Sequence, residues 1–170
     1  MAIDTSKIKT GPWEVKFKGN YIGAVTTDGI TLSFDARTRE RMVDRYGENL
    51  VDLIDMGLRV EVSLTMMEYV KENLAVALPQ GHEYTSYVTA GKMAGTELSG
   101  QAGELVLHPA DKAASDTTED IVIHKAVCTG SFELPLGTAN DRVLNVTFVA
   151  LLDTSKPEES RLLQVGIPAR

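Results

Sequence analysis

The chain has 170 residues and a net charge of −7, with 43% hydrophobic, 24% charged and only 6% aromatic side chains. That length predicts one domain over 1–170, and the acidic balance argues against a protein that grips a phosphate backbone, which needs clustered lysine and arginine. A single cysteine excludes an internal disulfide and favours a reducing compartment. We expect no secretory signal and no membrane span, because the sequence has no suitable apolar run.

The N-terminal part predicts an irregular arm followed by short strands. The arm covers residues 1–13 and closes on the turn-forming pair Gly11-Pro12. Alternating apolar residues predict strands over 14–18 and 21–25. A tight turn is expected at 27–29, where the sequence reads Thr-Asp-Gly.

Two alternating segments, 30–36 and 58–64, predict a long antiparallel hairpin with a wide charged tip over 37–57. If the first strand ran on to Arg45, it would be roughly 50 Å long at about 3.3 Å per residue. Few domains of this size have a core that could cover such a strand. The hairpin therefore suggests a protein that works as an assembly.

The charged tip is the candidate subunit interface. Arginine without lysine suits specific ion pairs between proteins, and the acidic residues nearby argue against nucleic acid. The alternative is a solvated hairpin tip. The candidate interface residues are Arg37, Arg39, Glu40, Arg41, Asp44 and Arg45.

One helix is expected over about 66–78. Thr65 and Glu68 have the spacing of a capping box, and the apolar residues that follow recur at helical intervals. This apolar stripe is typical of a helix packed on a sheet. The segment 80–103, rich in glycine, serine and threonine, predicts a flexible loop.

The C-terminal half predicts strands over 105–108, 121–128 with an extension to 136, 143–152, and 162–167. In the third of these, one face is wholly apolar from Leu144 to Leu152. The opposite face mixes polar residues with Val149 and Leu151. We expect the first face in the core and the second partly covered by another strand or subunit.

The sequence offers no catalytic, metal or cofactor constellation. His82, His108 and His124 lack metal-ligand spacing, and we expect them in loops or on the sheet surface. Gly91-Lys92 lacks the remainder of a phosphate-binding loop. Cys128 lies in a strand pattern and is expected to be a buried structural thiol.

Three segments resemble the tail tube (major tail) proteins of long-tailed bacteriophages. The run from Val143 to Gly166 looks like the family's strand, its Ser-Lys-Pro-Glu turn and its final short strand. The segment 22–32 is similar to the family's opening strand and turn, and 60–78 to its strand-into-helix junction with Glu68. Together they span most of the chain, and the segment 80–103 departs from the pattern.

The resemblance implies a mainly β fold: a β-sandwich with barrel-forming sheets, long hairpins and one flanking helix. It implies hexameric rings stacked into a tail tube, a smooth acidic channel through which DNA passes without specific binding. The partners would be further copies of the chain and the tape measure, tail terminator and tail-tip proteins. The location would be the virion tail, assembled in the host cytoplasm.

Within such a tube, the polar faces of the two hairpin strands would line the lumen. The candidate lumen-facing residues are Thr31, Ser33, Asp35, Glu61 and Ser63. The tip 37–57, the segment 80–103 and the arm 1–13 would make contacts between rings.

Two alternatives remain open at the level of sequence. The first is the inner tube of a type VI secretion system or a tailocin, which shares the ring fold and differs in cargo. The second is a monomeric ligand-binding β-barrel or an enzyme domain, which would need a pocket with convergent polar groups. The sequence reveals no such pocket.

Overall fold

In the computed structural model of this protein, the described residues are 11–23, 25–42, 44–47, 49–78, 80–91, 94–129, 134 and 141–166. Most of the expected arm over 1–13 lies outside them. Most of the expected strand extension to residue 136 also lies outside them. The remainder carries the sheet, its core and the long hairpin.

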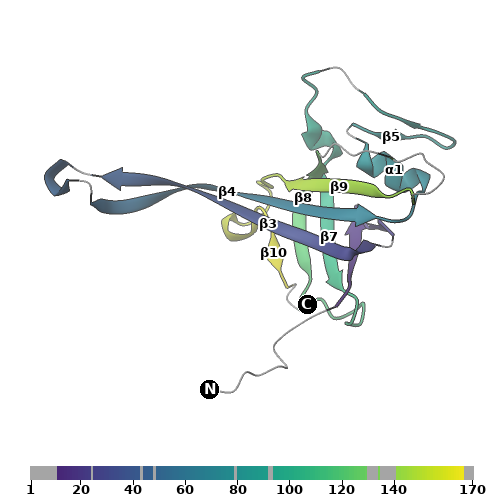
Figure 1. Ribbon diagram of the computed structural model, residues 1–170, viewed down its shortest axis with the longest axis horizontal. Coiled ribbons are helices and arrows are strands. Elements are labelled where there is room, and N and C mark those ends of the chain that lie inside the picture. The colour runs from purple at the N-terminus through teal and green to yellow at the C-terminus, as the bar shows by residue number, and fades with distance from the viewer. Residues whose placement is uncertain are drawn as a thin grey trace.

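The body is built on one antiparallel sheet, in the spatial order β2-β1-β7-β8-β9-β4-β3, with β10 paired to β8. Its strands are β1 (Trp13–Phe17), β2 (Asn20–Tyr21), β3 (Val25–Met42), β4 (Leu50–Met66), β7 (Gly103–Pro109), β8 (Ile121–Cys128), β9 (Leu144–Ala150) and β10 (Gln164–Val165). Figure 1 shows β3 and β4 leaving this body as a twisted ribbon.

The helical segments are short. The described residues include one α-helix, α1 (Lys71–Ala77), which lies at one end of the body beside β9 (Figure 1). The single-turn 3-10 helices are η2 (Asp44–Tyr46), η3 (Leu98–Gln101) and η4 (Glu158–Ser160). The prediction of a mainly β fold with a long hairpin and one helix is confirmed.

The core lies on the inner face of the curled sheet. Period-two alternation turns every second residue of β4 inward, from Val60 to Met66, each at most 4% exposed. From β9, Leu144, Val146 and Phe148 join them. The rings of Phe148 and Phe17 of β1 are 5.1 Å apart, although β7 and β8 separate their strands in the sheet order. The sheet therefore curls around its own core.

The predicted start of the helix is wrong. Met66 is the last residue of β4, fully buried opposite Leu144, and the helix begins only at Lys71. The Thr65 hydroxyl, expected to cap the helix, instead donates to Oδ1 of Asn145 at 2.6 Å. Pairing with β9 extends the strand through the capping motif, because sheet hydrogen bonds and core burial outweigh local helix signals.

Three further boundaries differ from prediction. The expected turn at 27–29 lies inside β3, where a register irregularity between Val25 and Ile30 absorbs it. The final strand is only β10, shorter than the predicted 162–167. The apolar face of the 143–152 segment stops early: β9 ends at Ala150 and Leu152 is 54% exposed.

The segment 80–103 contains a small hairpin, β5 (His82–Glu83) with β6 (Val88–Thr89). Lys71 of α1 holds it, because its Nζ donates to the carbonyls of Tyr84 (3.2 Å) and Thr85 (2.9 Å) and pairs with Glu83 at 3.1 Å. This hairpin is thereby attached to the helix beside the main sheet.

Candidate functional site

The most unusual surface is the distal part of the β3–β4 hairpin, residues 34–58, which we call the arm. The arm projects far from the body (Figure 1). It carries large apolar side chains that are 38–58% exposed. They are Phe34, Met42, Leu50, Val51, Leu53, Ile54, Met56 and Leu58. Large exposed apolar side chains gathered on one projecting element mark an interaction site.

The backbone of the arm is also open along its edges. β9 pairs with β4 only from Glu61 to Met66, so the arm part of β4 has β3 as its one strand partner among the described residues. β3 in turn pairs only with β4 in the described part of the chain. Free strand edges are templates for pairing with another chain. The arm thus offers both apolar side chains and unpaired backbone groups.

The register of the strands brings the candidate lumen-facing residues onto one face. Thr31 lies opposite Ser63, Ser33 opposite Glu61, and Asp35 opposite Arg59. Directly opposite residues in an antiparallel pair point to the same side of the sheet. The core lies on the other side, because the intervening residues of β4 are buried.

This polar face continues onto β9. Ser63 lies opposite Thr147, with their hydroxyl oxygens 3.2 Å apart, and Thr65 lies opposite Asn145. The result is a three-stranded ladder of short polar side chains on the side of the sheet opposite the buried core. On the same face, these neutral groups are followed by the charged residues Asp35, Arg59 and Glu61, of which Arg59 and Glu61 form an ion pair.

The candidate interface residues all lie on the arm and are all exposed. Arg37, Arg39 and Arg41 alternate along β3 in phase with Thr31, Ser33 and Asp35. Arg41 lies opposite Asp52 and Arg39 opposite Ile54.

The remaining members are placed differently. Glu40 belongs to the opposite face, across from Leu53, and Asp44 and Arg45 form η2 at the tip. The two predicted sets are therefore not separate surfaces, because three interface arginines continue the polar face of the lumen set.

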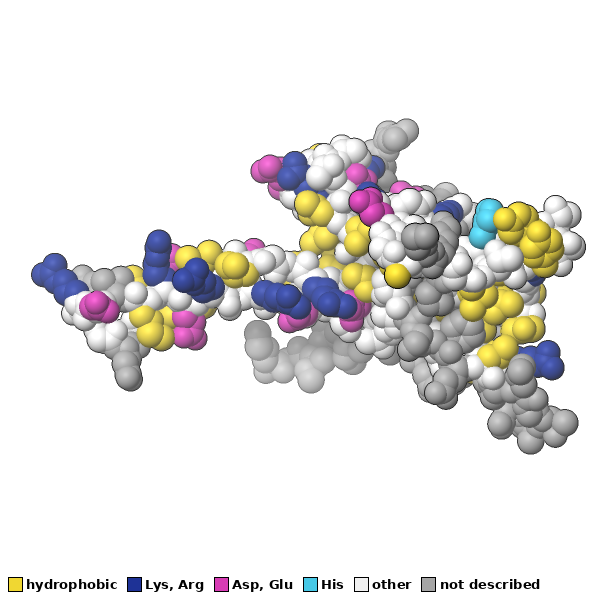
Figure 2. Space-filling model, turned by 90° about the horizontal axis from the view of Figure 1, so that it is seen from above, with side chains coloured by type: hydrophobic (Ala, Val, Ile, Leu, Met, Phe, Trp, Pro, Cys, Tyr) yellow, Lys and Arg dark blue, Asp and Glu magenta, His cyan; other side chains and the backbone are white. Residues whose placement is uncertain are grey.

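The ion pairs of the arm leave some arginines available. Arg37 lies 3.6 Å from the Asp35 carboxylate, and Arg59 pairs with Glu61. Arg39, Arg41 and Arg45 have no ion pair with another described residue. Figure 2 shows the basic side chains spread along the arm among apolar and acidic ones.

The tip, predicted as charged, is largely apolar on its β4 side. Register irregularities at Ala36/Thr38 and at Arg41/Met42 shift the alternation there, so apolar residues of 50–56 occur on both faces. Gly57, at φ +109°, adopts a conformation that other residues rarely do at the first of these irregularities. The available signal was the run Leu-Val-Asp-Leu-Ile-Asp-Met over 50–56, too apolar for a solvated tip.

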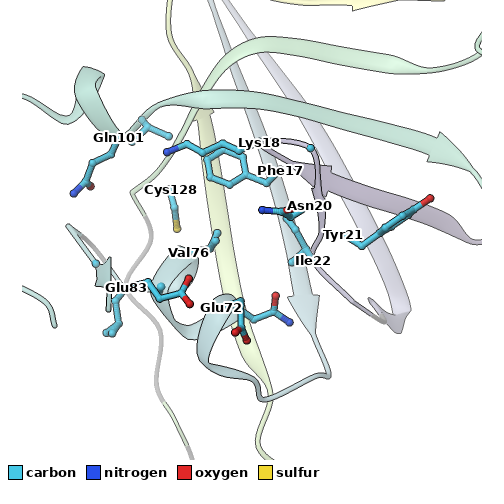
Figure 3. Close-up of a pocket in the computed structure, with 16 residues that line it drawn as sticks. Phe17, Lys18, Asn20, Tyr21, Ile22, Glu72, Val76, Glu83, Gln101 and Cys128 are labelled. Carbon is cyan, nitrogen blue, oxygen red and sulfur yellow. The ribbon is translucent and has the colours of Figure 1, made fainter. Parts of the chain in front are cut away.

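A cavity of about 620 Å³ opens beside α1 (Figure 3). Its apolar wall comes from β1, α1 and β8, and its polar rim includes Lys18, Asn20, Glu72, Glu83 and Gln101. The apolar wall includes Phe17, Ile22, Val76, Leu78, Val127 and Cys128. This cavity is not predictable from the sequence, because its walls come from segments far apart along the chain.

The histidines are more buried than predicted. His108 is 5% exposed, and its Nδ1 lies 2.6 Å from Oδ1 of Asp120, itself 4% exposed. Burial, followed by the charge of Lys156, lowers the pKa of His124 below its usual 6.5. Only His82 is exposed, on the β5–β6 hairpin. The His108–Asp120 pair joins β7 to the loop before β8, which is a structural role.

Metal and thiol chemistry receive no support from the described residues. No group of three histidine, cysteine or carboxylate side chains among them could hold a metal ion. Cys128 is buried, as predicted, with its Sγ 3.7 Å from the carbonyl oxygen of Ala77. Within the described residues, no α-helix has the length and hydrophobicity of a membrane-spanning segment.

Comparison with known proteins gives distant structural likeness only. No family model matches the chain, and no curated protein does. The tube-terminating cap of an anti-feeding prophage is similar at 12% identity and a TM-score of 0.48, over 88% of this chain and 90% of that one. The sheath/tube terminator of an extracellular contractile injection system (PVC) is similar at 14% identity and 0.45, over 84% and 91%.

Proposed function

We propose that this protein is a structural subunit that polymerises as stacked hexameric rings to form the tail tube of a long-tailed phage. The observation that carries this proposal is the arm. It has 18- and 17-residue strands whose distal halves have no core to cover, open edges and bare apolar side chains. Pairing between the arms of neighbouring copies would bury the apolar side chains and pair the open strand edges. Closing the ring would then leave no free edge.

The polar ladder supports a channel as the product of this assembly. When neighbouring hairpins join, the face with Thr31, Ser33, Asp35, Glu61 and Ser63 becomes a continuous polar surface opposite the cores. It would line the lumen. In the proposed assembly the arginines that continue this face along the arm lie in subunit contacts, so the lumen keeps few groups that could hold DNA phosphates. The role is structural, with no enzymatic step.

In this proposal the chain 1–170 is one tube domain with three contact elements. The tip 37–57, the segment 80–103 and the N-terminal segment 1–13 would join successive rings. The partners would be further copies and the tape measure, tail terminator and tail-tip proteins in the virion tail. A type VI or tailocin inner tube would use the same ring and differ in what passes through it.

The test is electron microscopy of the purified protein over a rising concentration series. We expect rings or hollow tubes, and a monomer at all concentrations would contradict the proposal. The cavity beside α1 is the one observation that supports the alternative, a monomeric ligand-binding protein. Sizing chromatography distinguishes that monomer from a tube subunit that assembles. A compact monomer with a bound small molecule would favour the alternative, and recovery of DNA or of protein cargo from assembled lumens would separate phage from secretion tubes.

A further inference from the structure

We propose that His124 is a pH-sensitive latch, and that its protonation releases the segment 151–163 from β8. This segment, which we call the strap, connects β9 to β10. The inference goes beyond the proposed assembly, because it concerns the fold of a single chain and requires no second copy.

The strap is attached to β8 at both of its ends. At its start, the amide of Leu151 donates to the carbonyl oxygen of Lys125 at 2.7 Å. At its far end, the strap leads into β10, where Gln164 pairs with Val122 of β8 (Figure 1). His124 lies between these two attachments along β8, so its side chain is placed where the strap crosses the strand.

The imidazole of His124 is enclosed without hydrogen bonds. Ile121 and Ile123 pack in the core, so the alternation of β8 turns His124 to the other face. Both of its ring nitrogens are nevertheless buried, and neither has a hydrogen-bond partner among the described residues. A protonated imidazole carries two N–H donors. Protonation here would bury a charge together with two unsatisfied donors, which disfavours the closed strap.

The charged groups that act on His124 come from β7 and from the strap. Lys156 of the strap opposes protonation, whereas Glu104 of β7 and Asp153 of the strap favour it. Burial has the largest effect and Lys156 the next, so the pKa of His124 lies below its usual 6.5. Lys125 is its charged neighbour on β8 itself. The other elements that contact β8, which are β9, β10 and η3, contain no charged residue.

The direction of the pH response follows from these surroundings. When the strap opens, water solvates the imidazole and its pKa returns toward 6.5. The open state therefore binds more protons than the closed state as the pH falls below 6.5, and the strap opens more often. Opening would free the carbonyl oxygen of Lys125 and uncover Leu162 and Leu163, which pack against the core.

A second buried histidine has to be separated from His124. His108 of β7 lies with its Nδ1 2.6 Å from Oδ1 of Asp120, and the carbonyl oxygen of Asp120 accepts the Gly166 amide at 2.7 Å. A response from this pair would begin beyond the far end of the strap. The Leu151 amide, at the opposite end, is therefore the better reporter of His124.

The test is amide hydrogen exchange of the purified full-length chain by NMR at about pH 7.5 and about pH 5, with rates corrected for the intrinsic effect of pH. We expect the protection of the Leu151 amide to fall at least about threefold, because each unit of pKa difference is worth a factor of ten. The amides of the β4–β9 ladder are the internal reference and should keep their protection. A titration of the His124 ring signals should give a pKa below 6.5.

Three variants assign the response. His124→Phe keeps a ring but does not titrate, and should lose the fall in Leu151 protection. His124→Gln removes the titrating group with a smaller polar side chain, which covers the case in which phenylalanine does not fit. His82→Gln replaces the exposed histidine of the β5–β6 hairpin and is the matched control, which should respond as wild type does.

Three results would overturn the latch. The first is a wild-type strap whose Leu151 protection stays the same at both pH values. The second is a His124 pKa at or above 6.5 in the folded chain. The third is a fall that persists in both His124 variants, which would assign the response to His108–Asp120 or to the carboxylates instead.

Discussion

At the scale of single residues, the pair His108–Asp120 is a buried link between β7 and the loop that precedes β8. Replacing Asp120 by Ala leaves a buried imidazole without its partner, which costs about 1–3 kcal/mol of unfolding free energy. Denaturant unfolding measures this loss. The exposed Asp111→Ala variant in the same loop is the control and should change stability by no more than about 0.5 kcal/mol. Equal effects of the two substitutions would contradict the structural role.

Asp116 gives a pH-dependent prediction at the same scale. A hydrogen bond from the Thr118 hydroxyl at 2.6 Å, helped by the Thr118 amide and the Lys112 ammonium, lowers the pKa of Asp116 from 3.8 to about 2. Since the folded pKa lies below the unfolded one, this contribution to stability is present above pH 3.8 and is lost as pH falls toward 2.

Thr118→Val removes the hydroxyl donor and should raise the pKa of Asp116 toward 3.8 in an NMR titration of the side-chain carboxyl. Asp153 is an internal control, because the Ser155 hydroxyl and amide hold its pKa low in a separate loop. A rise at Asp153, or none at Asp116, would show that the local hydrogen bond is not the cause.

At the scale of elements, we expect that deleting the arm leaves the free energy of unfolding of the body nearly unchanged. The buried core begins at Val60 of β4 and includes no residue of the arm. Replacing 38–55 by a two-residue turn should therefore change the free energy of unfolding by less than about 1 kcal/mol. The same variant should lose assembly in sedimentation.

The contrast for this deletion is Leu144→Ala in the core. Leu144 is fully buried in β9, so its truncation should cost about 2–5 kcal/mol through lost burial and a cavity. If deleting the arm cost as much, the arm would be part of the cooperative core and not a surface awaiting a partner.

The elements also show what the sequence could predict. Alternation placed the hairpin strands and the inner face of β9 correctly, because period two follows directly from strand geometry. The prediction failed at Thr65 and Met66. These residues stay in β4 because they pair with Asn145 and Leu144 of β9, although their local sequence has a helix-capping pattern. The cavity beside α1 could not be predicted from the sequence, because its walls come from segments that only the fold brings together.

At the scale of the whole molecule, the predictions concern contacts between copies. Arg39 and Arg41 are exposed on the arm, and replacing both by Glu breaks no ion pair within the described part of the chain. The double variant should keep the wild-type unfolding transition. It should raise the protein concentration needed for tube formation at least tenfold, because it reverses the charge of a surface that must approach another subunit.

The conservative variant Arg39→Lys with Arg41→Lys separates charge from geometry. It keeps both positive charges and loses the planar fork of the guanidinium, so it should assemble better than the Glu variant but less well than wild type. Light scattering gives the threshold concentration and electron microscopy the tube length. Tubes of wild-type length from the Glu variant would show that the tip arginines lie outside every subunit contact. The apolar residues of the arm would then have to account for assembly by themselves.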